Sequence, residues 1–161
     1  MRVTRPGPYR SRMSLDRMGS PATLHPRATP PGPLPALLGF RIAVALGGIV
    51  PVSAGLAGML FGPAMVGGLP GGADADSHLR YLSGLLLGIG LGFWSTIPDP
   101  LRHGGRFRLL TAIVVLGGLG RLLGLALQGP PGPPMLAALV MELVVTPLLC
   151  LWHFRLAAAA R

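Results

Sequence analysis

The chain has 161 residues, of which 50% are hydrophobic and only 12% are charged, and its mean hydropathy is +0.59. Soluble proteins carry about 25% charged residues, so this composition excludes an ordinary soluble domain. The 25 Gly and 18 Pro follow no collagen period, and the apolar content is too high for a disordered polymer. We expect a small one-domain protein that crosses the lipid bilayer several times.

The net charge of +9 comes from 14 basic residues, all of them Arg. Most of them gather in the N-terminal part, in one short loop and near the C-terminal end, which is the pattern that orients membrane proteins. No nucleic-acid-binding motif accompanies them, so we expect no nucleic-acid partner. Cys150 is the one cysteine, which excludes an intrachain disulfide.

The chain divides into a tail and an apolar domain. Residues 1–33 are rich in Arg, Pro and Ser and cannot bury a core, so we expect a disordered cytosolic tail. Each apolar segment of the domain approaches the roughly 20 residues that cross a bilayer as a helix, and Pro and Gly clusters separate the segments. We predict an all-α fold, an integral membrane four-helix antiparallel bundle. It occupies residues 34–157, with spans at about 37–61, 79–97, 109–127 and 135–154.

The Arg residues also predict the orientation of this bundle. The tail, the loop 98–108 and the C-terminal residues carry Arg, whereas the loops 62–78 and 128–134 carry none. Because cytoplasmic loops are enriched in basic residues, we expect both termini in the cytoplasm. Arg80, just inside the second segment, is the exception on the outer side.

Glu142 is the one carboxylate inside the four apolar segments. A charge in hydrocarbon costs roughly 3 kcal/mol or more, so such a residue usually faces the protein interior and has a partner. The midpoint between Arg121 and Glu142 falls at position 131.5, in the Gly- and Pro-rich connection between the third and fourth segments. In an antiparallel hairpin the two residues are then level, about 10 Å below the outer surface. We predict a buried ion pair between them.

A second group of polar residues opens the second segment. Asp76 and Arg80 are spaced i,i+4, and His78 and Tyr81 are spaced i,i+3, so each pair shares a helix face. The predicted topology places these four residues on the outer side of the bundle with the predicted ion pair. Such a polar cluster either locks helices together, or lines a cavity for a polar or anionic ligand, or relays protons.

Small residues recur on the second and third segments at spacings that place them on one helix face. In membranes such faces let helices pack closely. The residues that we expect at helix contacts are Gly84, Gly88, Gly92, Gly117, Gly120 and Gly124.

Three blocks of this sequence resemble a family of small bacterial membrane proteins catalogued as domain of unknown function 4345. They are DSHLRYLSGLLLGIG at 76–90, GGLGRL at 117–122 and ELVVTPLLCLW at 142–152, and the resemblance covers about residues 36–156. It implies an integral membrane protein with four helices and no assigned activity. It also implies that the polar cluster and the predicted ion pair occupy the polar positions of that family.

These observations favour a non-enzymatic protein of a bacterial inner membrane whose outer polar cluster binds a small polar or anionic ligand. The histidines lie on opposite sides of the predicted bundle, and Ser53, Ser83 and Ser95 have no nearby His–carboxylate pair in the sequence. We therefore assign no catalytic residue, metal site or cofactor. Three alternatives stay open: a proton-coupled small-molecule transporter acting as a homodimer, a redox-partner subunit, and a structural or assembly protein in which the charge pair only locks helices.

Overall fold

The computed structural model describes residues 34–67 and 71–161, and this part of the chain is helical, with no strand. The prediction of an all-α fold is confirmed for these residues. The predicted tail, residues 1–33, lies outside the described residues.

The first two long helices are joined by a short connection. α1 spans Leu34–Phe61 and continues into a 3-10 segment, η1, at Gly62–Val66. α2 spans Gly72–Trp94 and begins several residues before the predicted span at 79–97, because its polar first turns are helical as well. Asp74 lies in the first turn, where a negative charge interacts favourably with the helix dipole.

The third and last long helices form the other half of the domain. α3 spans Gly104–Gln128. The last helix consists of α4 at Pro133–Val140, a π-helical segment, η2, at Met141–Val145, and α5 at Thr146–Ala159.

Three stretches of the described chain are long and apolar enough to cross a membrane. They are Pro35–Met65, Gly104–Gln128 and Pro133–Ala159. Only 22%, 11% and 6% of their most apolar windows are buried within the protein, so most of their apolar side chains face outward. Such exposure suits a hydrocarbon surrounding and points to a membrane protein. α2, with its polar first turns, is not among these three stretches.

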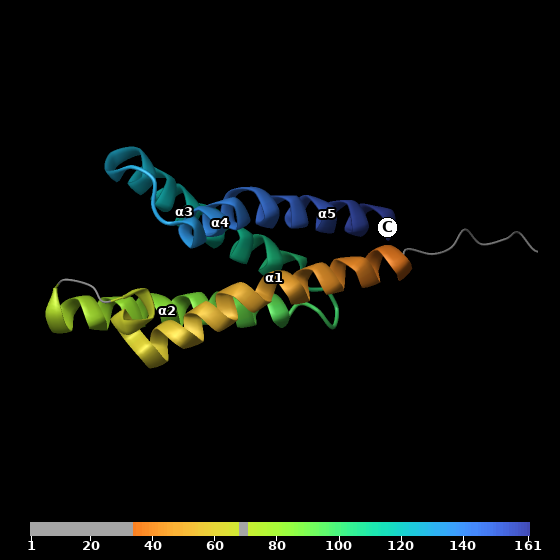
Figure 1. Cartoon of the computed structure of the whole chain (residues 1–161). Coiled ribbons are helices and arrows are strands. Elements are labelled where there is room, and N and C mark those ends of the chain that lie inside the picture. Colours follow the sequence, from red (N-terminus) through yellow and green to blue (C-terminus); the bar gives the residue numbers. More distant parts are fainter. Residues whose placement is uncertain (1–33, 68–70) are drawn as a thin grey trace, which may run out of the picture. The chain divides into compact units, whose positions relative to one another are not determined.

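The helices pair in two hairpins. α1 packs along α2, and α3 packs along the helix formed by α4, η2 and α5 (Figure 1). Glycines bring α1 and α2 close together: a Cβ at Gly55 would lie 2.5 Å from the backbone nitrogen of Leu87, and one at Gly90 would lie 2.7 Å from the Val52 side chain. Close backbone approach at glycine is a common way for apolar helices to associate.

The two hairpins meet at one end, which we call the aromatic end and define by Phe40, Phe93, Phe107, Trp152 and His153. There the ring of Phe107 stacks on His153 with 5.4 Å between centroids, and Phe40 meets Trp152 edge to face. α1 contacts α5 and α2 contacts α3, but in the described part of the chain neither α1 nor α2 contacts α4 or η2.

Candidate binding site beside the Arg121–Glu142 ion pair

Arg121 on α3 and Glu142 on η2 form a bidentate ion pair. Nε of Arg121 donates to Oε2 of Glu142 at 3.0 Å, and Nη2 donates to Oε1 at 3.1 Å. The Arg121 side chain is 35% exposed and the Glu142 side chain 18%. Two parallel charge-assisted hydrogen bonds fix the orientation of a carboxylate as well as its position. The pair therefore fastens α3 to the last helix at the level of η2.

Gly118 allows the two backbones to approach at this level. A Cβ at Gly118 would lie 2.9 Å from the Cβ of Glu142 and 2.7 Å from the side chain of Leu143. Gly118 and Arg121 are three residues apart on α3, so they share the helix face that contacts η2.

The π-helical segment carries Glu142 and ends at Val145, two residues before a proline. The backbone N–H and the hydroxyl of Thr146 both donate to the carbonyl of Met141, the hydroxyl at 2.8 Å. Pro147 has no N–H with which to continue the α-helical pattern. Single π-helical turns within α-helices occur frequently at functional sites.

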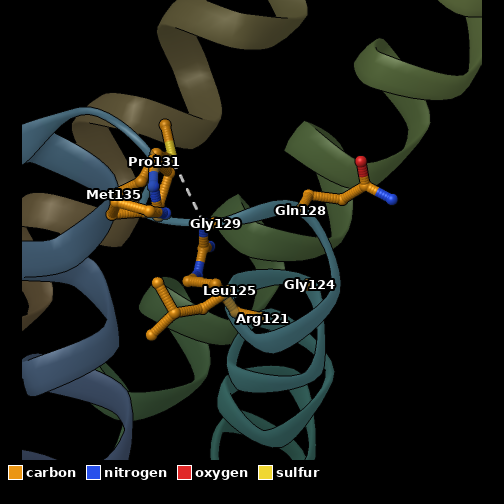
Figure 2. Close-up of a pocket in the computed structure, with 8 residues that line it drawn as sticks. Arg121, Gly124, Leu125, Gln128, Gly129, Pro131 and Met135 are labelled. Carbon is orange, nitrogen blue, oxygen red and sulfur yellow. Dashed lines mark hydrogen bonds between the residues drawn. The ribbon is translucent and has the colours of Figure 1, made fainter.

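A cavity of about 370 Å³ lies beside the ion pair, between the end of α3 and the start of α4 (Figure 2). Arg121 lines it, and its Nη1 donates to Sδ of Met135 at 3.0 Å, the dashed line in Figure 2. A thioether sulfur is a weak acceptor, so this corner of the guanidinium group keeps most of its hydrogen-bonding capacity. The lining residues are Arg121, Gly124, Leu125, Gln128, Gly129, Pro130, Pro131 and Met135.

Asp76 and Arg80 form a second ion pair on α2. Nε of Arg80 donates to Oδ2 of Asp76 at 2.9 Å, and Nη1 donates to the carbonyls of Met59 and Leu60 at the end of α1. The last carbonyls of a helix lack partners within the helix and carry partial negative charge. Arg80 thus caps α1 and holds the start of α2 against it.

The structure separates the predicted polar cluster from the Arg121–Glu142 pair. His78 and Tyr81 are exposed, and no residue of α2 lines the cavity beside Arg121. The six residues that the sequence places together on the outer side thus form two ion pairs, one in each hairpin, with His78 and Tyr81 in neither. Among the described residues no three His, Cys, Asp or Glu side chains gather in a way that could hold a metal ion.

The predicted glycine faces coincide only in part with the helix contacts. A Cβ at Gly84 would lie 3.6 Å from Sδ of Met59, and one at Gly92 would lie 3.1 Å from Leu110. On α3 the contact is made by Gly118, which the spacing of small residues did not predict. Its position three residues before Arg121 places it on the same helix face and could have indicated it. At Gly88, Gly117, Gly120 and Gly124 a Cβ would meet no atom of the described residues within 4 Å.

Comparison with known families agrees with the resemblance noted in the sequence. The family described as a domain of unknown function, DUF4345, matches residues 39–153, which is well over half of the chain. The chain belongs to this family. The DUF4345 match includes both ion pairs and the whole of η2. No curated protein and no solved structure matches the chain.

Proposed function

We propose that this DUF4345 protein is a non-enzymatic, multi-pass protein of a bacterial inner membrane that binds a small polar or anionic ligand in the cavity beside Arg121 and Glu142. The observation that carries the proposal is the placement of Arg121. Its Nε and Nη2 hold Glu142, and the side chain also lines the cavity, where among the described residues Nη1 has only a sulfur acceptor.

The chemistry of the cavity limits the ligand that fits it. A volume of about 370 Å³ lies at the small end of the range for small-molecule sites, which is roughly 300–1,000 Å³. Glu142 already balances the charge of Arg121, so a neutral polar ligand or a singly charged anion fits better than a polyanion. An oxygen of such a ligand would displace Met135 as the acceptor of the Nη1 proton.

The four-span topology and the cytoplasmic termini are part of this proposal. α2 has 23 residues, which is about 35 Å of helix and enough to cross a bilayer. Its close packing along α1 and the polar capping of α1 by Arg80 support α2 as a partner span. With α2 as a span, the cavity beside Arg121 opens toward the outer side, as the distribution of Arg indicates.

The π-helical segment favours one alternative, a proton-coupled transporter acting as a homodimer. Glu142 is a partly shielded carboxylate in a widened helical turn, and such carboxylates carry protons in transporters. The structural alternative rests on the completeness of the ion pair, because a bidentate pair is enough to explain two charges in an apolar hairpin. Ligand binding discriminates these functions, since a purely structural pair needs no ligand.

The test is ligand-dependent thermal stability of the purified protein in detergent. We would screen small monocarboxylates, phosphate monoesters, amides and polyols against the wild type, Arg121→Gln and Arg80→Gln. A ligand that binds the folded state raises Tm. We expect a shift for the wild type that Arg121→Gln loses and Arg80→Gln keeps, because Arg80 does not line the cavity. No shift with any compound would favour the structural alternative.

A further inference from the structure

A second cavity, of about 270 Å³, lies at the aromatic end, where α3 begins and α5 passes it. Its lining includes Gly104 and Gly105 at the start of α3, and His153 on α5. Three arginines also line it: Arg102, Arg108 and Arg161. Neither Arg121 nor any other residue of the site described above takes part.

The start of α3 is an uncompensated positive helix end. The first N–H groups of a helix have no partner within it, and the helix dipole adds a partial positive charge there. No acidic residue lies in the first turn of α3, and the N-cap residue, His103, makes no side-chain hydrogen bond to it. The cavity therefore contains groups that attract an anion.

The three arginines form no ion pair within the described part of the chain, and the Asp99 carboxylate beside them accepts from the backbone N–H of Arg102 at 3.3 Å. Among the described residues, the two ion pairs involve Arg80 and Arg121 only. Arg108 lies over the ring of Phe154 at 5.7 Å, and its Nε donates to the carbonyl of Gly104 at 3.3 Å, so its side chain is held beside the helix start. The fixed guanidinium group presents its remaining N–H groups in the planar geometry that suits phosphate.

His153 forms a buried wall of this cavity. The residue is 3% exposed, and its Nε2 lies 2.9 Å from the carbonyl oxygen of Pro100. A carbonyl only accepts, so Nε2 carries the proton of that bond. Nδ1 is buried and has no hydrogen-bond partner in the part of the chain that the structure describes. A Cβ at Gly104 would lie 2.8 Å from Cε1 of His153, so the imidazole lies against the first residue of α3.

We propose that this cavity binds a phosphate group between the start of α3, Arg102, Arg108 and His153. The arginines and the first N–H groups of α3 donate to the phosphate oxygens, and the buried imidazole of His153 forms a wall of the cavity. The phosphate belongs either to the headgroup of an anionic phospholipid or to a small soluble molecule. This site is independent of the proposed function, because the two cavities share no residue.

The experiment compares two variants that remove the same charge. Arg102→Gln with Arg108→Gln removes two arginines that line the cavity. Arg106→Gln with Arg155→Gln removes two exposed arginines of the same helices that do not line it. Native mass spectrometry would measure retention of phosphatidylglycerol against phosphatidylcholine, and calorimetry in lipid-free detergent would measure binding of inorganic phosphate.

We expect the cavity variant to bind one of the two probes at least about tenfold more weakly than the wild type, while the control variant keeps wild-type affinity. Loss of phosphatidylglycerol alone identifies a lipid headgroup, and loss of inorganic phosphate identifies a soluble phosphate. Equal weakening in both double variants, or no binding of either probe by the wild type, would overturn the proposal.

Discussion

Arg121 holds the carboxylate of Glu142 through two parallel hydrogen bonds, 3.0 and 3.1 Å long, across 21 residues of sequence. The two residues belong to different helices, and their bond is the polar link between α3 and the π-helical segment. Because the pair is only partly shielded, its other atoms can contact a ligand. The same bond that fastens the hairpin thus orients Arg121 at the cavity.

The first prediction concerns the energy of this pair. Arg121→Leu and Glu142→Leu should each lower the free energy of unfolding by about 1–3 kcal/mol, less than for a fully buried pair, because each leaves a partly shielded charge without a partner. The double variant should lose less than the sum of the single losses. Unfolding in detergent micelles measures all four proteins. Strict additivity would show that the two side chains do not interact.

A second prediction separates two adjacent glycines. Gly118→Ala should destabilise the protein by about 1–3 kcal/mol, because its methyl group would collide with Glu142 and Leu143. Gly117→Ala is the matched control and should be neutral or stabilising by up to about 1 kcal/mol, since a Cβ there meets nothing within 4 Å. Thermal unfolding of the two variants tests which of the two glycines on α3 faces the last helix. The reverse order of stabilities would contradict it.

The π-helical turn gives a third prediction. Thr146→Val removes the hydroxyl bond to Met141, and Thr111→Val removes a similar bond to the carbonyl of Phe107 in plain α-helix. Each loss should destabilise by about 1 kcal/mol. Only Thr146→Val should also weaken ligand binding at Arg121, because Thr146 holds the turn that carries Glu142. Titration of the two variants with a ligand found in the screen measures this difference. Equal affinities would show that the π-helical turn does not contribute to ligand binding.

A fourth prediction tests the topology. In a Cys150→Ser background, single cysteines at Ala73, in the first turn of α2, and at Asp99 and Pro131, in the next two connections, report the three ends between the long helices. We expect an impermeant maleimide to label the first and third in intact cells and the second only after permeabilisation. If Ala73→Cys and Asp99→Cys were labelled from the same side, α2 would not cross the membrane.

Contacts within one helical hairpin could be predicted from the sequence, whereas contacts between the two hairpins could not. The level positions of Arg121 and Glu142 follow from the symmetry of an antiparallel pair of helices about a short connection, and the structure joins these residues. The association of Asp76 and Arg80 with them depended on contacts between hairpins, and α2 makes none with η2. Their i,i+4 spacing predicted their own pairing on α2, but not the capping of α1 by Arg80.

Two other features could not be predicted from residue patterns. A four-residue spacing drifts around a helix with 3.6 residues per turn, so it does not decide whether Gly117 or Gly118 meets the neighbouring helix. The buried environment of His153 depends on the turn at Pro100, which is distant in sequence and is brought close only by the packing of the aromatic end.

Native mass spectrometry of the protein extracted from its own membranes in lipid particles tests the central claim most directly. Leu125→Trp fills the cavity beside Arg121 without altering a charge, and Arg80→Gln breaks the ion pair of the other hairpin. We predict a small-molecule adduct on the wild type and on Arg80→Gln that is absent from Leu125→Trp. An identical set of bound masses on all three proteins would contradict a ligand site beside Arg121 and Glu142.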